Sequence, residues 1–270
     1  MKNLFMQNRN FFVMNKMKMI QLQRKKINII RNIRRNLPPF AIRNNYNSII
    51  PLNIFQTWHS HSLPPLMARA VNKLRLNNPR FKYHLFNDND CREFIKNNYS
   101  EEILRTFDNL IPGAYKADLW RYCILYKLGG IYLDIKYECF NHFKFIHLTE
   151  SEHFVCDIDG QGIYNALMVC LPGNPILLHA INKIVQHVRE KYYGPNCLYP
   201  TGPMLLANII HDRKNVDMKH KLVSGNFNNR VIIYDNTIIL KSYNGYISES
   251  RHHQNTEHYS VLWNRRHIYK

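Results

Sequence analysis

The chain has 270 residues, of which 45% are hydrophobic and 21% are charged, and this composition excludes a wholly disordered or collagen-like chain. Its length allows one or two folded units with a sizeable core. The formal net charge is +18, and the six cysteines form no Cys-x-x-Cys pair, which argues against a zinc module and favours reduced thiols.

The positive charge is concentrated at the N-terminal end. Residues 1–87 hold 16 Lys and Arg and no acidic residue, whereas residues 88–270 hold 21 Lys and Arg and all 19 acidic residues. We therefore expect a basic, poorly ordered arm over residues 1–48 and a folded domain over residues 49–270. The arm is interpreted either as a solvated leader, which we favour, or as a segment that docks on nucleic acid or an anionic membrane surface.

Apolar runs near the N-terminus are short. No run reaches the ~18–20 residues that a membrane-spanning helix needs. The longest N-terminal candidate, residues 11–14, is ended by Asn15 and Lys16, so neither a membrane anchor nor a signal peptide is predicted. The expected location is the cytoplasm, with a membrane surface as the alternative.

The first part of the domain alternates strands and helices. Residues 49–58 are mostly apolar with a polar end, a pattern typical of a buried parallel strand that delivers residues to a ligand crevice. A Pro-Pro pair precedes a segment with apolar residues at helical spacing, and Asn87 to Asp90 is a candidate helix cap. The elements predicted after the first strand are a helix at 66–76, a strand at 81–86, a helix ending near 95 and a helix at 100–107.

The longest helical pattern covers residues 114–127. It follows a Pro-Gly turn and stops at Gly129 and Gly130, which favour a left-handed cap. A strand is predicted directly afterwards, at 131–135. The later predicted elements are a strand at 166–170, a helix at 175–191, a short helix ending at 210, and strands at 231–234 and 237–240. Strands that alternate with helices favour an α/β layered domain.

Three residues in and after the long helix are candidates for chemistry. Asp118 and Arg121 are three residues apart, so they share a helix face and can pair or jointly bind a polyhydroxyl ligand. Their planar, bidentate hydrogen bonding suits sugar hydroxyls and phosphate oxygens. Asp134 stands where the next strand emerges, the usual position of a carboxylate that binds a ribose or a metal. Taken alone, an Asp-x-x-Arg pair is more often a surface salt bridge, and a single Asp at a strand end is a helix cap about half the time, so the spacing does not decide the role.

The sequence around these residues resembles a known family. The run from Asp118 to Asp134 is similar to the A-D-x-x-R-Y…G-G-x-Y-x-D-x-D signature of DXD-type sugar transferases. These transferases are glycosyltransferase family 32, which includes fungal initiating mannosyltransferases and is related to the glucosylating domains of large clostridial toxins. Three more segments match in the same order: residues 50–58, Thr201-Gly202-Pro203 and, less closely, residues 258–263. Their joint occurrence is more specific than any single motif.

The resemblance implies a fold, a reaction and a set of site residues. The fold would be a GT-A type nucleotide-sugar-binding fold, with a central, mostly parallel sheet flanked by helices. The reaction would move a sugar from a UDP- or GDP-linked donor to a hydroxyl of a carbohydrate or glycoconjugate acceptor, with retention of configuration. By matching position, the catalytic residues would be Asp118, Arg121 and Asp134. The donor would contact Thr57, Trp58, Tyr132, Lys136 and Trp263, although a packing role competes for Trp58 and Tyr132.

One position departs from the family pattern. The second acidic residue of D-x-D, normally a ligand for Mn²⁺ or Mg²⁺, is Lys136 in this chain. Three interpretations stay open. In the first, which we favour, a divalent cation is held by Asp134 together with Glu138 and His258. In the second, Lys136 itself neutralises the leaving diphosphate. In the third, the chain is a degenerate, inactive relative.

The competing function is that of a binding protein. Its sugar-transferase body would be catalytically silent, and its basic arm would contact nucleic acid or an anionic surface. Lys136 favours this alternative, whereas the joint presence of Asp118, Arg121 and Asp134 favours the enzyme. We therefore expect a glycosyltransferase whose partners are donor and acceptor, and nucleic acid is not the expected partner.

Overall fold

The computed structural model describes residues 43, 45–157, 161–211, 222–225, 231–253 and 256–270. These residues belong to one compact unit, which spans residues 40–270. The predicted arm lies almost entirely outside the described residues, so its boundary at 48/49 stays a prediction. Within the described part of the chain, no helix is long and apolar enough to cross a membrane.

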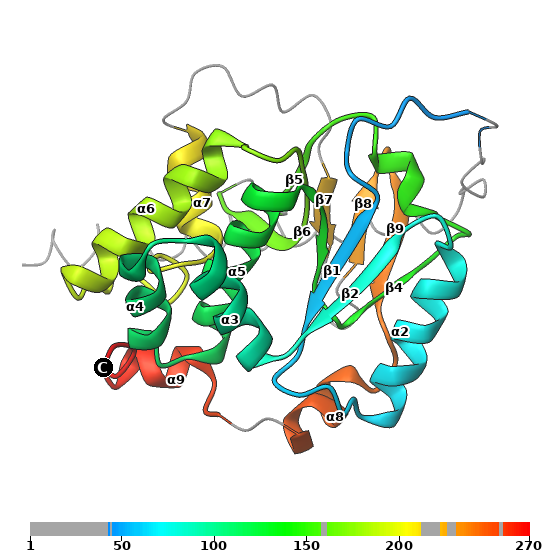
Figure 1. The fold of residues 1–270 in the computed structure, drawn as a ribbon. Coiled ribbons are helices and arrows are strands. Elements are labelled where there is room, and N and C mark those ends of the chain that lie inside the picture. The colour runs from blue at the N-terminus through cyan, green and yellow to red at the C-terminus, as the bar shows by residue number, and fades with distance from the viewer. Residues whose placement is uncertain (1–42, 44, 158–160, 212–221, 226–230, 254–255) are drawn as a thin grey trace, which may run out of the picture. The chain divides into compact units, whose positions relative to one another are not determined.

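A mixed β-sheet forms the centre of this unit (Figure 1). Within the described residues its nine strands are β1 (Asn53–Thr57), β2 (Lys82–Phe86), β3 (Gly130–Leu133), β4 (Tyr137–Cys139), β5 (His153–Cys156), β6 (Ile163–Cys170), β7 (Leu222–Gly225), β8 (Val231–Tyr234) and β9 (Thr237–Ser242). Their order in the sheet is β2-β1-β3-β6-β5-β7-β8-β9-β4.

The sheet contains both parallel and antiparallel neighbours. The parallel arrangement that was predicted is found where β1 lies between β2 and β3, and again between β5 and β7. The other five neighbour pairs among these strands are antiparallel. Three of them, β5–β6, β7–β8 and β8–β9, are consecutive strands whose short connections cannot form the crossover that a parallel pair requires. β8 and β9, for example, are joined by Asp235 and Asn236 with φ of 45° and 59°, the backbone of a tight hairpin turn.

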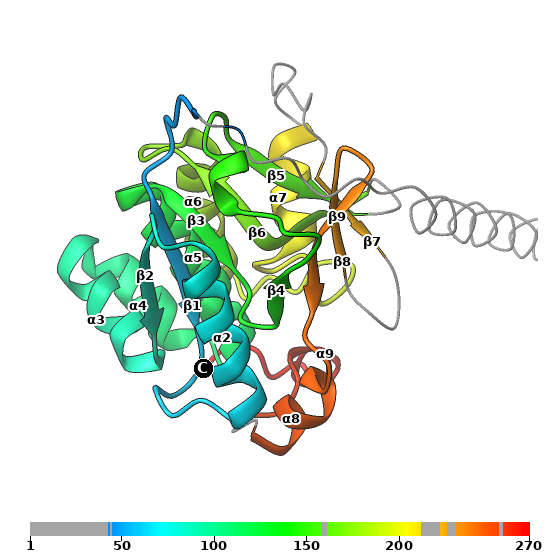
Figure 2. The ribbon, with the colours of Figure 1, turned by 90° about the vertical axis from the view of Figure 1, so that its right-hand side faces the viewer.

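Helices cover both faces of the sheet, which confirms the α/β class. In Figures 1 and 2, α5 and α6 lie over one face and α2 lies over the opposite face. The described helices are α2 (Pro65–Asn77), α3 (Asp88–Asn98), α4 (Glu101–Asn109), α5 (Gly113–Leu128), α6 (Pro175–Arg189), α7 (Pro203–His211), α8 (Tyr246–His253) and α9 (Tyr259–Asn264), with the short 3-10 helix η1 (Phe145–Leu148).

The side chains of β3 alternate between two hydrophobic cores. Ile131 and Leu133 belong to the core that also contains Leu74 of α2. Tyr132 belongs to the other core, which contains the buried residues of α5. Both faces of the strand are therefore dry, which explains why its sequence is an unbroken apolar run.

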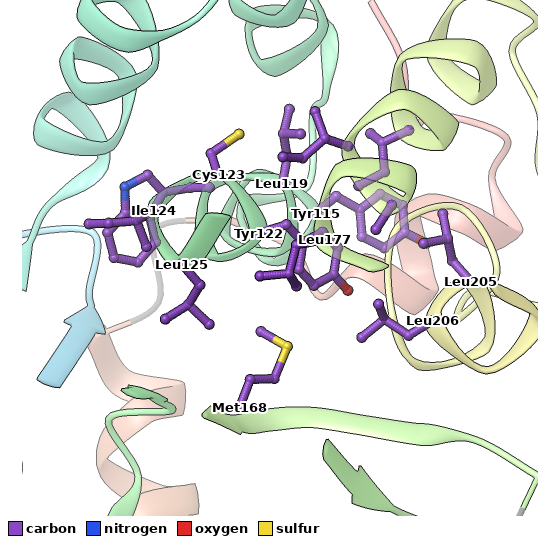
Figure 3. Close-up of a cluster of buried hydrophobic side chains, with 14 of the residues drawn as sticks. Tyr115, Leu119, Tyr122, Cys123, Ile124, Leu125, Met168, Leu177, Leu205 and Leu206 are labelled. Atoms are coloured by element: carbon purple, nitrogen blue, oxygen red, sulfur yellow. The ribbon is translucent and has the colours of Figure 1, made fainter. Parts of the chain in front are cut away.

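α5 is buried on almost every side. Tyr115 and all residues from 118 to 125 are buried. Figure 3 shows side chains of α5 among residues from α6, α7 and β6, with Leu177, Leu205 and Met168 marking these neighbours. A helix with no wet face has to find partners for its polar side chains inside the protein.

Two glycines allow β3 to begin directly after α5. Gly129 has a φ of +60°, and a Cβ there would lie 2.6 Å from Pro172 Cδ. Gly130 has a φ of +116°, and a Cβ there would lie 2.9 Å from Asn53 O. No larger residue fits this backbone, so the predicted double-glycine cap is confirmed. The tight reversal places Asp134 just beyond the end of β3, close to the helix that precedes it.

Sequence patterns located most elements but not all. The cap that was predicted before α3 is a capping box between Asn87 and Asp90, and all six cysteines are free. The patterns missed β4, β5, β7, α8 and α9, and β6 begins at Ile163 instead of residue 166. The missed strands have three or four residues each, too few for a periodicity to emerge.

Candidate active site

The candidate site lies at the edge of the sheet where β1 and β3 end. These strands are parallel neighbours, with Phe55 opposite Tyr132. Continuing this register by two residues brings Thr57 level with Asp134. The side-chain amide of Gln56 donates to Asp134 O at 3.4 Å. Parallel strands thus bring to one edge two segments that are far apart in the sequence.

Arg121 of α5 joins the two carboxylates that the motif contains. Its Nη2 lies 3.3 Å from Asp118 Oδ1, and its Nη1 lies 3.3 Å from Asp134 Oδ1. Nη1 also donates to Asn165 O at 2.8 Å, and the guanidinium carbon lies 4.2 Å from the centre of the Tyr132 ring. Arg121 is only 6% exposed. The pairing on one helix face that was predicted is therefore present, and it is an internal contact.

Asp118 is held by two segments of the chain besides its own helix, the Thr-Gly-Pro turn and β6. Thr201 Oγ1 donates to Asp118 Oδ2 at 2.7 Å, and Asn165 Nδ2 donates to Oδ1 at 2.9 Å. A Cβ at Gly202 would lie 3.3 Å from Oδ2, so a larger residue would crowd the carboxylate. Burial raises the pKa of Asp118, and the charge of Arg121 opposes that shift. The Thr-Gly-Pro turn thus serves as part of the carboxylate's pocket.

Asp134 receives hydrogen bonds on both oxygens. Tyr132 Oη donates to Oδ1 at 2.9 Å, and Lys136 Nζ donates to Oδ2 at 2.5 Å. Burial would raise the pKa of Asp134, but the charges of Lys136 and Arg121 outweigh it and hold the pKa below its ordinary value. Its side chain is 24% exposed, compared with 11% for Asp118 and 7% for Arg121. Asp134 is therefore the carboxylate of the pair that a ligand reaches first.

Lys136 is folded back onto Asp134 by a turn. Tyr137 N donates to Asp134 O at 3.1 Å, and Tyr243 N donates to Lys136 O at 3.0 Å. The ammonium lies 5.3 Å from the ring centres of both Tyr137 and Tyr164. Burial would lower the pKa of Lys136, but Asp134 raises it above its ordinary value. Lys136 is 5% exposed, so this cation is held charged and almost dry.

The predicted metal ligands are not assembled around a common point. Among the described residues, no three His, Cys, Asp or Glu side chains form a group able to hold a metal ion. Glu138 instead bonds to Lys73 at 3.0 Å and to Lys241 at 3.2 Å. His258 caps α9 through its ring nitrogen. Asp134 is bound to its own cations, so these three residues have separate partners.

Thr57 and Trp58, which were predicted to bind the donor, lie together at the end of β1, whereas Trp263 lies elsewhere. Thr57 Oγ1 donates to Phe86 O at 2.9 Å, and the next residue, Trp58, bonds the same carbonyl through its backbone N–H at 3.1 Å. Trp58 Nε1 is buried, and no described residue offers it an acceptor, which is rare for a buried N–H. Trp263 is engaged elsewhere, because its Nε1 donates to Tyr193 O at 2.7 Å.

The structure adds three side chains that were not predicted as site residues. Thr201 and Asn165 bind Asp118, and the ring of Tyr164 lies beside Lys136. For Thr201 the Thr-Gly-Pro motif was a signal. Asn165 and Tyr164 lie in the first half of β6, which the sequence pattern did not recognise as a strand, so no signal marked them.

Part of the chain matches a family model. Residues 64–154 match the model described as "Glycosyltransferase sugar-binding region containing DXD motif". The inositol phosphoceramide mannosyltransferase 3 of Schizosaccharomyces pombe is 32% identical over 170 residues, which are 62% of this chain and 47% of that protein. The initiation-specific alpha-1,6-mannosyltransferase of Candida albicans is 31% identical over 91 residues, 32% of this chain and 24% of that protein. The chain thus spans about half the length of the first relative and about a quarter of the second.

These matches confirm the resemblance that the motifs suggested. The matched region contains Asp118, Arg121 and Asp134, and the relatives named above are mannosyltransferases. Among solved structures, the PaToxG glycosyltransferase aligns with a TM-score of 0.49 and 14% identity over 62% of this chain and 70% of that chain.

A divalent cation does not fit the residues at the DXD position. Transferases with a DXD motif generally bind such a cation, and its preferred ligands are carboxylate and other oxygens. Here Lys136 Nζ stands 2.5 Å from Asp134 Oδ2, and Arg121 and Tyr132 take Oδ1. The donor set offers one carboxylate that is already neutralised, beside an ammonium that would repel the metal.

Proposed function

We propose that this chain, whose residues 64–154 match the sugar-binding region of DXD-type glycosyltransferases, transfers a sugar from a nucleotide-diphosphate sugar to an acceptor hydroxyl. The acceptor is a carbohydrate or glycoconjugate. Retention of configuration, which the family resemblance implies, is part of the proposal. The names of the relatives favour mannose as the transferred sugar, with a GDP-linked or UDP-linked donor.

The observation that carries the proposal is the network that joins Asp118, Arg121 and Asp134. The network stands at the carboxyl ends of β1 and β3, where α/β sheets bind nucleotides. Its members lie at the positions that match the DXD family motif. Two carboxylates aligned by one guanidinium provide acceptors for sugar hydroxyls and a fixed charge pattern for the reacting centre.

The network suggests a separate role for each residue. Asp134 is the most exposed of the three, so it contacts the donor, at the ribose or the sugar. Asp118 uses its remaining acceptor capacity for a sugar hydroxyl, because its oxygens accept from Asn165 and Thr201 without being filled. Arg121 is a positioning residue that sets the distance between the two carboxylates.

The end of β1 is the proposed place of the nucleotide. Thr57 is the last residue of β1 and Trp58 follows it, at the same edge as Asp134. The buried N–H of Trp58 Nε1 has no acceptor among the described residues, so it can donate a hydrogen bond to a bound group. Tyr132 is expected to contact the donor only indirectly, because its hydroxyl is bonded to Asp134 and its ring packs against Arg121.

The test is transfer by the whole chain and by the Asp118→Asn variant. The substitution keeps the size of the side chain but removes the charge and one acceptor. Turnover is measured with GDP-mannose and a panel of UDP-sugars, by mass spectrometry of the nucleotide and the product. For the preferred donor, turnover by the variant should be about 10²–10³-fold lower, the cost typical of losing a group that stabilises the transition state. The anomeric configuration of the product, measured by NMR, tests retention.

The matched control is Asp108→Asn. Asp108 is also paired with an arginine, since Arg92 Nη2 lies 2.7 Å from its Oδ2. This pair is on the surface, because the two side chains are 38% and 35% exposed. This variant should keep full turnover. Unchanged turnover in Asp118→Asn, with a circular dichroism spectrum like that of the parent chain, would contradict the site assignment.

A further inference from the structure

The site is electrically balanced by its own side chains. It contains two carboxylates, Asp118 and Asp134, and two cations, Arg121 and Lys136, joined in one chain of contacts. An acidic residue at position 136, as the D-x-D pattern has, would leave an excess of two negative charges. That excess is what a divalent cation neutralises. With Lys136 in place, the same balance is reached without any added ion.

Lys136 is held as a fixed cation. A turn between Asp134 and Tyr137 places the lysine beside the carboxylate. The rings of Tyr137 and Tyr164 lie 5.3 Å from its ammonium, a distance at which aromatic faces attract a cation. Because Lys136 is 5% exposed, its charge is weakly screened and acts strongly on any anion that comes near.

The ammonium has hydrogen-bonding capacity left for a ligand. A lysine carries three N–H donors, and the bond to Asp134 Oδ2 uses one of them. The side chain of Asp134 is 24% exposed, so a ligand can reach it from solvent. Lys136 lies directly behind this carboxylate. A diphosphate bound beside Asp134 therefore lies near a preformed positive group.

We propose that Lys136 takes the place of the divalent cation in this chain, so that sugar transfer proceeds without a metal. In the step, the bond between the anomeric carbon and the diphosphate oxygen breaks, and its electron pair stays on that oxygen. The acceptor hydroxyl oxygen bonds to the anomeric carbon, and its proton passes to the departing diphosphate. Lys136 stabilises the negative charge that grows on the diphosphate. This inference rests on the proposed function.

A purely structural ion pair is the competing explanation for Lys136. In that case the lysine would only hold Asp134 in place, and a metal would still neutralise the diphosphate. The two explanations differ in three measurable quantities: the effect of EDTA, the binding of nucleoside diphosphate without metal, and the response of a Lys136→Asp variant to Mn²⁺.

The first experiment measures turnover of the preferred donor by the full chain in metal-free buffer with EDTA, and again with Mn²⁺. We expect turnover with EDTA to stay within about 2-fold of turnover with Mn²⁺. The Lys136→Met variant, which keeps an unbranched side chain one atom shorter and without the charge, should lose about 10²–10³-fold in kcat, and added Mn²⁺ should not restore it. The Lys136→Arg variant should retain more activity than Lys136→Met.

The second experiment measures binding, independently of turnover. Isothermal titration with GDP and UDP in EDTA should show that the parent chain binds one of them and that Lys136→Met binds it at least 10-fold more weakly. Mn²⁺ titrated alone should bind to Lys136→Asp, which rebuilds D-x-D, but not to the parent chain. Lys136→Asp should then require Mn²⁺ for both nucleotide binding and turnover.

The matched control is Lys241→Met. Lys241 is also paired with a carboxylate, Glu138 at 3.2 Å, and also lies over an aromatic ring, that of Phe140 at 5.0 Å. This variant should behave like the parent chain in both experiments. Thermal melts of every variant identify any loss of fold.

The outcomes separate the two proposals. Turnover that EDTA abolishes and Mn²⁺ restores would overturn the inference and leave the proposed function standing. Mn²⁺ binding to the parent chain at the nucleotide site would overturn it as well. Absence of turnover with every donor, both with EDTA and with Mn²⁺, would instead contradict the proposed function, while the binding measurements would still decide whether Lys136 replaces the cation.

Discussion

Arg121 illustrates how one side chain can be both functional and structural. Its guanidinium contacts Asp118 on its own helix, Asp134 after β3 and the carbonyl of Asn165 in β6. Arg121 is 6% exposed, so bulk solvent screens the charges around it only weakly. A buried carboxylate that loses its cation is costly, because its charge is then desolvated without compensation.

We therefore predict that Arg121→Ala destabilises the fold as well as the site. The free energy of unfolding, measured by urea denaturation at pH 7, should fall by about 3–5 kcal/mol, the typical cost of breaking a buried ion pair from one side. If the variant is too unstable to purify, Arg121→Lys should show a smaller loss of the same kind, because it keeps the charge but not the planar fork.

Arg92→Ala is the control for this prediction. Arg92 makes a two-pronged pair with Asp108, at 2.8 Å and 2.7 Å, but its side chain is 38% exposed. Exposed pairs contribute about 0–1 kcal/mol. Equal losses of unfolding free energy in the two variants would show that the contribution of Arg121 to stability does not come from its burial.

At the scale of elements, the connection between α5 and β3 positions the site. α5 carries Asp118 and Arg121, β3 leads to Asp134, and only Gly129 separates the helix from the strand. Gly129 combines a φ of 60° with a ψ of 179°, a region that is essentially restricted to glycine. The site geometry depends on this short reversal, because any longer loop would move Asp134 relative to Arg121.

We predict that Gly129→Ala lowers both stability and activity. A Cβ at this position would lie 2.6 Å from Pro172 Cδ and 2.7 Å from Pro172 N. Backbone strain alone costs about 1–3 kcal/mol, and the clash adds to it, so the loss in unfolding free energy should exceed 3 kcal/mol. Turnover per folded molecule should fall too, since β3 has to shift.

Gly173→Ala separates backbone strain from the clash. Gly173 also has a positive φ, +75°, but nothing lies within 4 Å of a Cβ built there. This variant should cost only about 1–2 kcal/mol, the price of a left-handed conformation for a residue with a Cβ, and should keep its turnover. A loss as large as that of Gly129→Ala would show that contact with Pro172 is not the cause.

At the scale of the whole molecule, the described residues just before β1 are attached to η1 and the loop after it. The hydroxyl of Tyr46 lies 2.8 Å from His147 Nδ1, and the hydroxyls of Ser48 and Thr149 are 2.6 Å apart. Asn47 N donates to Glu150 Oε1 at 2.9 Å. Thr149 and His147 are buried, so their partners cannot be replaced easily by water.

We predict that the two possible truncations differ. A chain that begins at Arg43 should unfold like the full chain and keep its turnover, because the contacts of residues 46–48 remain. A chain that begins at Ile49 should lose about 1–3 kcal/mol of unfolding free energy, the cost of leaving buried polar groups without partners. Thermal and urea denaturation of both chains measure the difference. Equal stabilities would place the start of the folded domain at residue 49, as the sequence predicts.

Local patterns in the sequence determined the central unit of the site. The helical spacing of α5, the double glycine and the apolar run of β3 are short-range features, and each constrains the backbone within a few residues. They located Asp118 and Arg121 on one helix face and Asp134 at a strand end, and the structure confirms all three positions. Lys136 was also recognisable as a departure, because the motif is local.

Tertiary structure alone decided which groups surround these residues. Asn165, Tyr164 and Thr201 reach the site through the register of β6 and the turn before α7, and no local pattern encodes a register between distant strands. The N-terminus of α2 is capped in the same way by Glu249 of α8, more than 180 residues away. The predicted metal ligands Glu138 and His258 have separate partners for the same reason: β4 pairs with β9, and His258 starts α9. Proximity across the fold depends on how the strands pair and the cores close, which are properties of the whole packed chain.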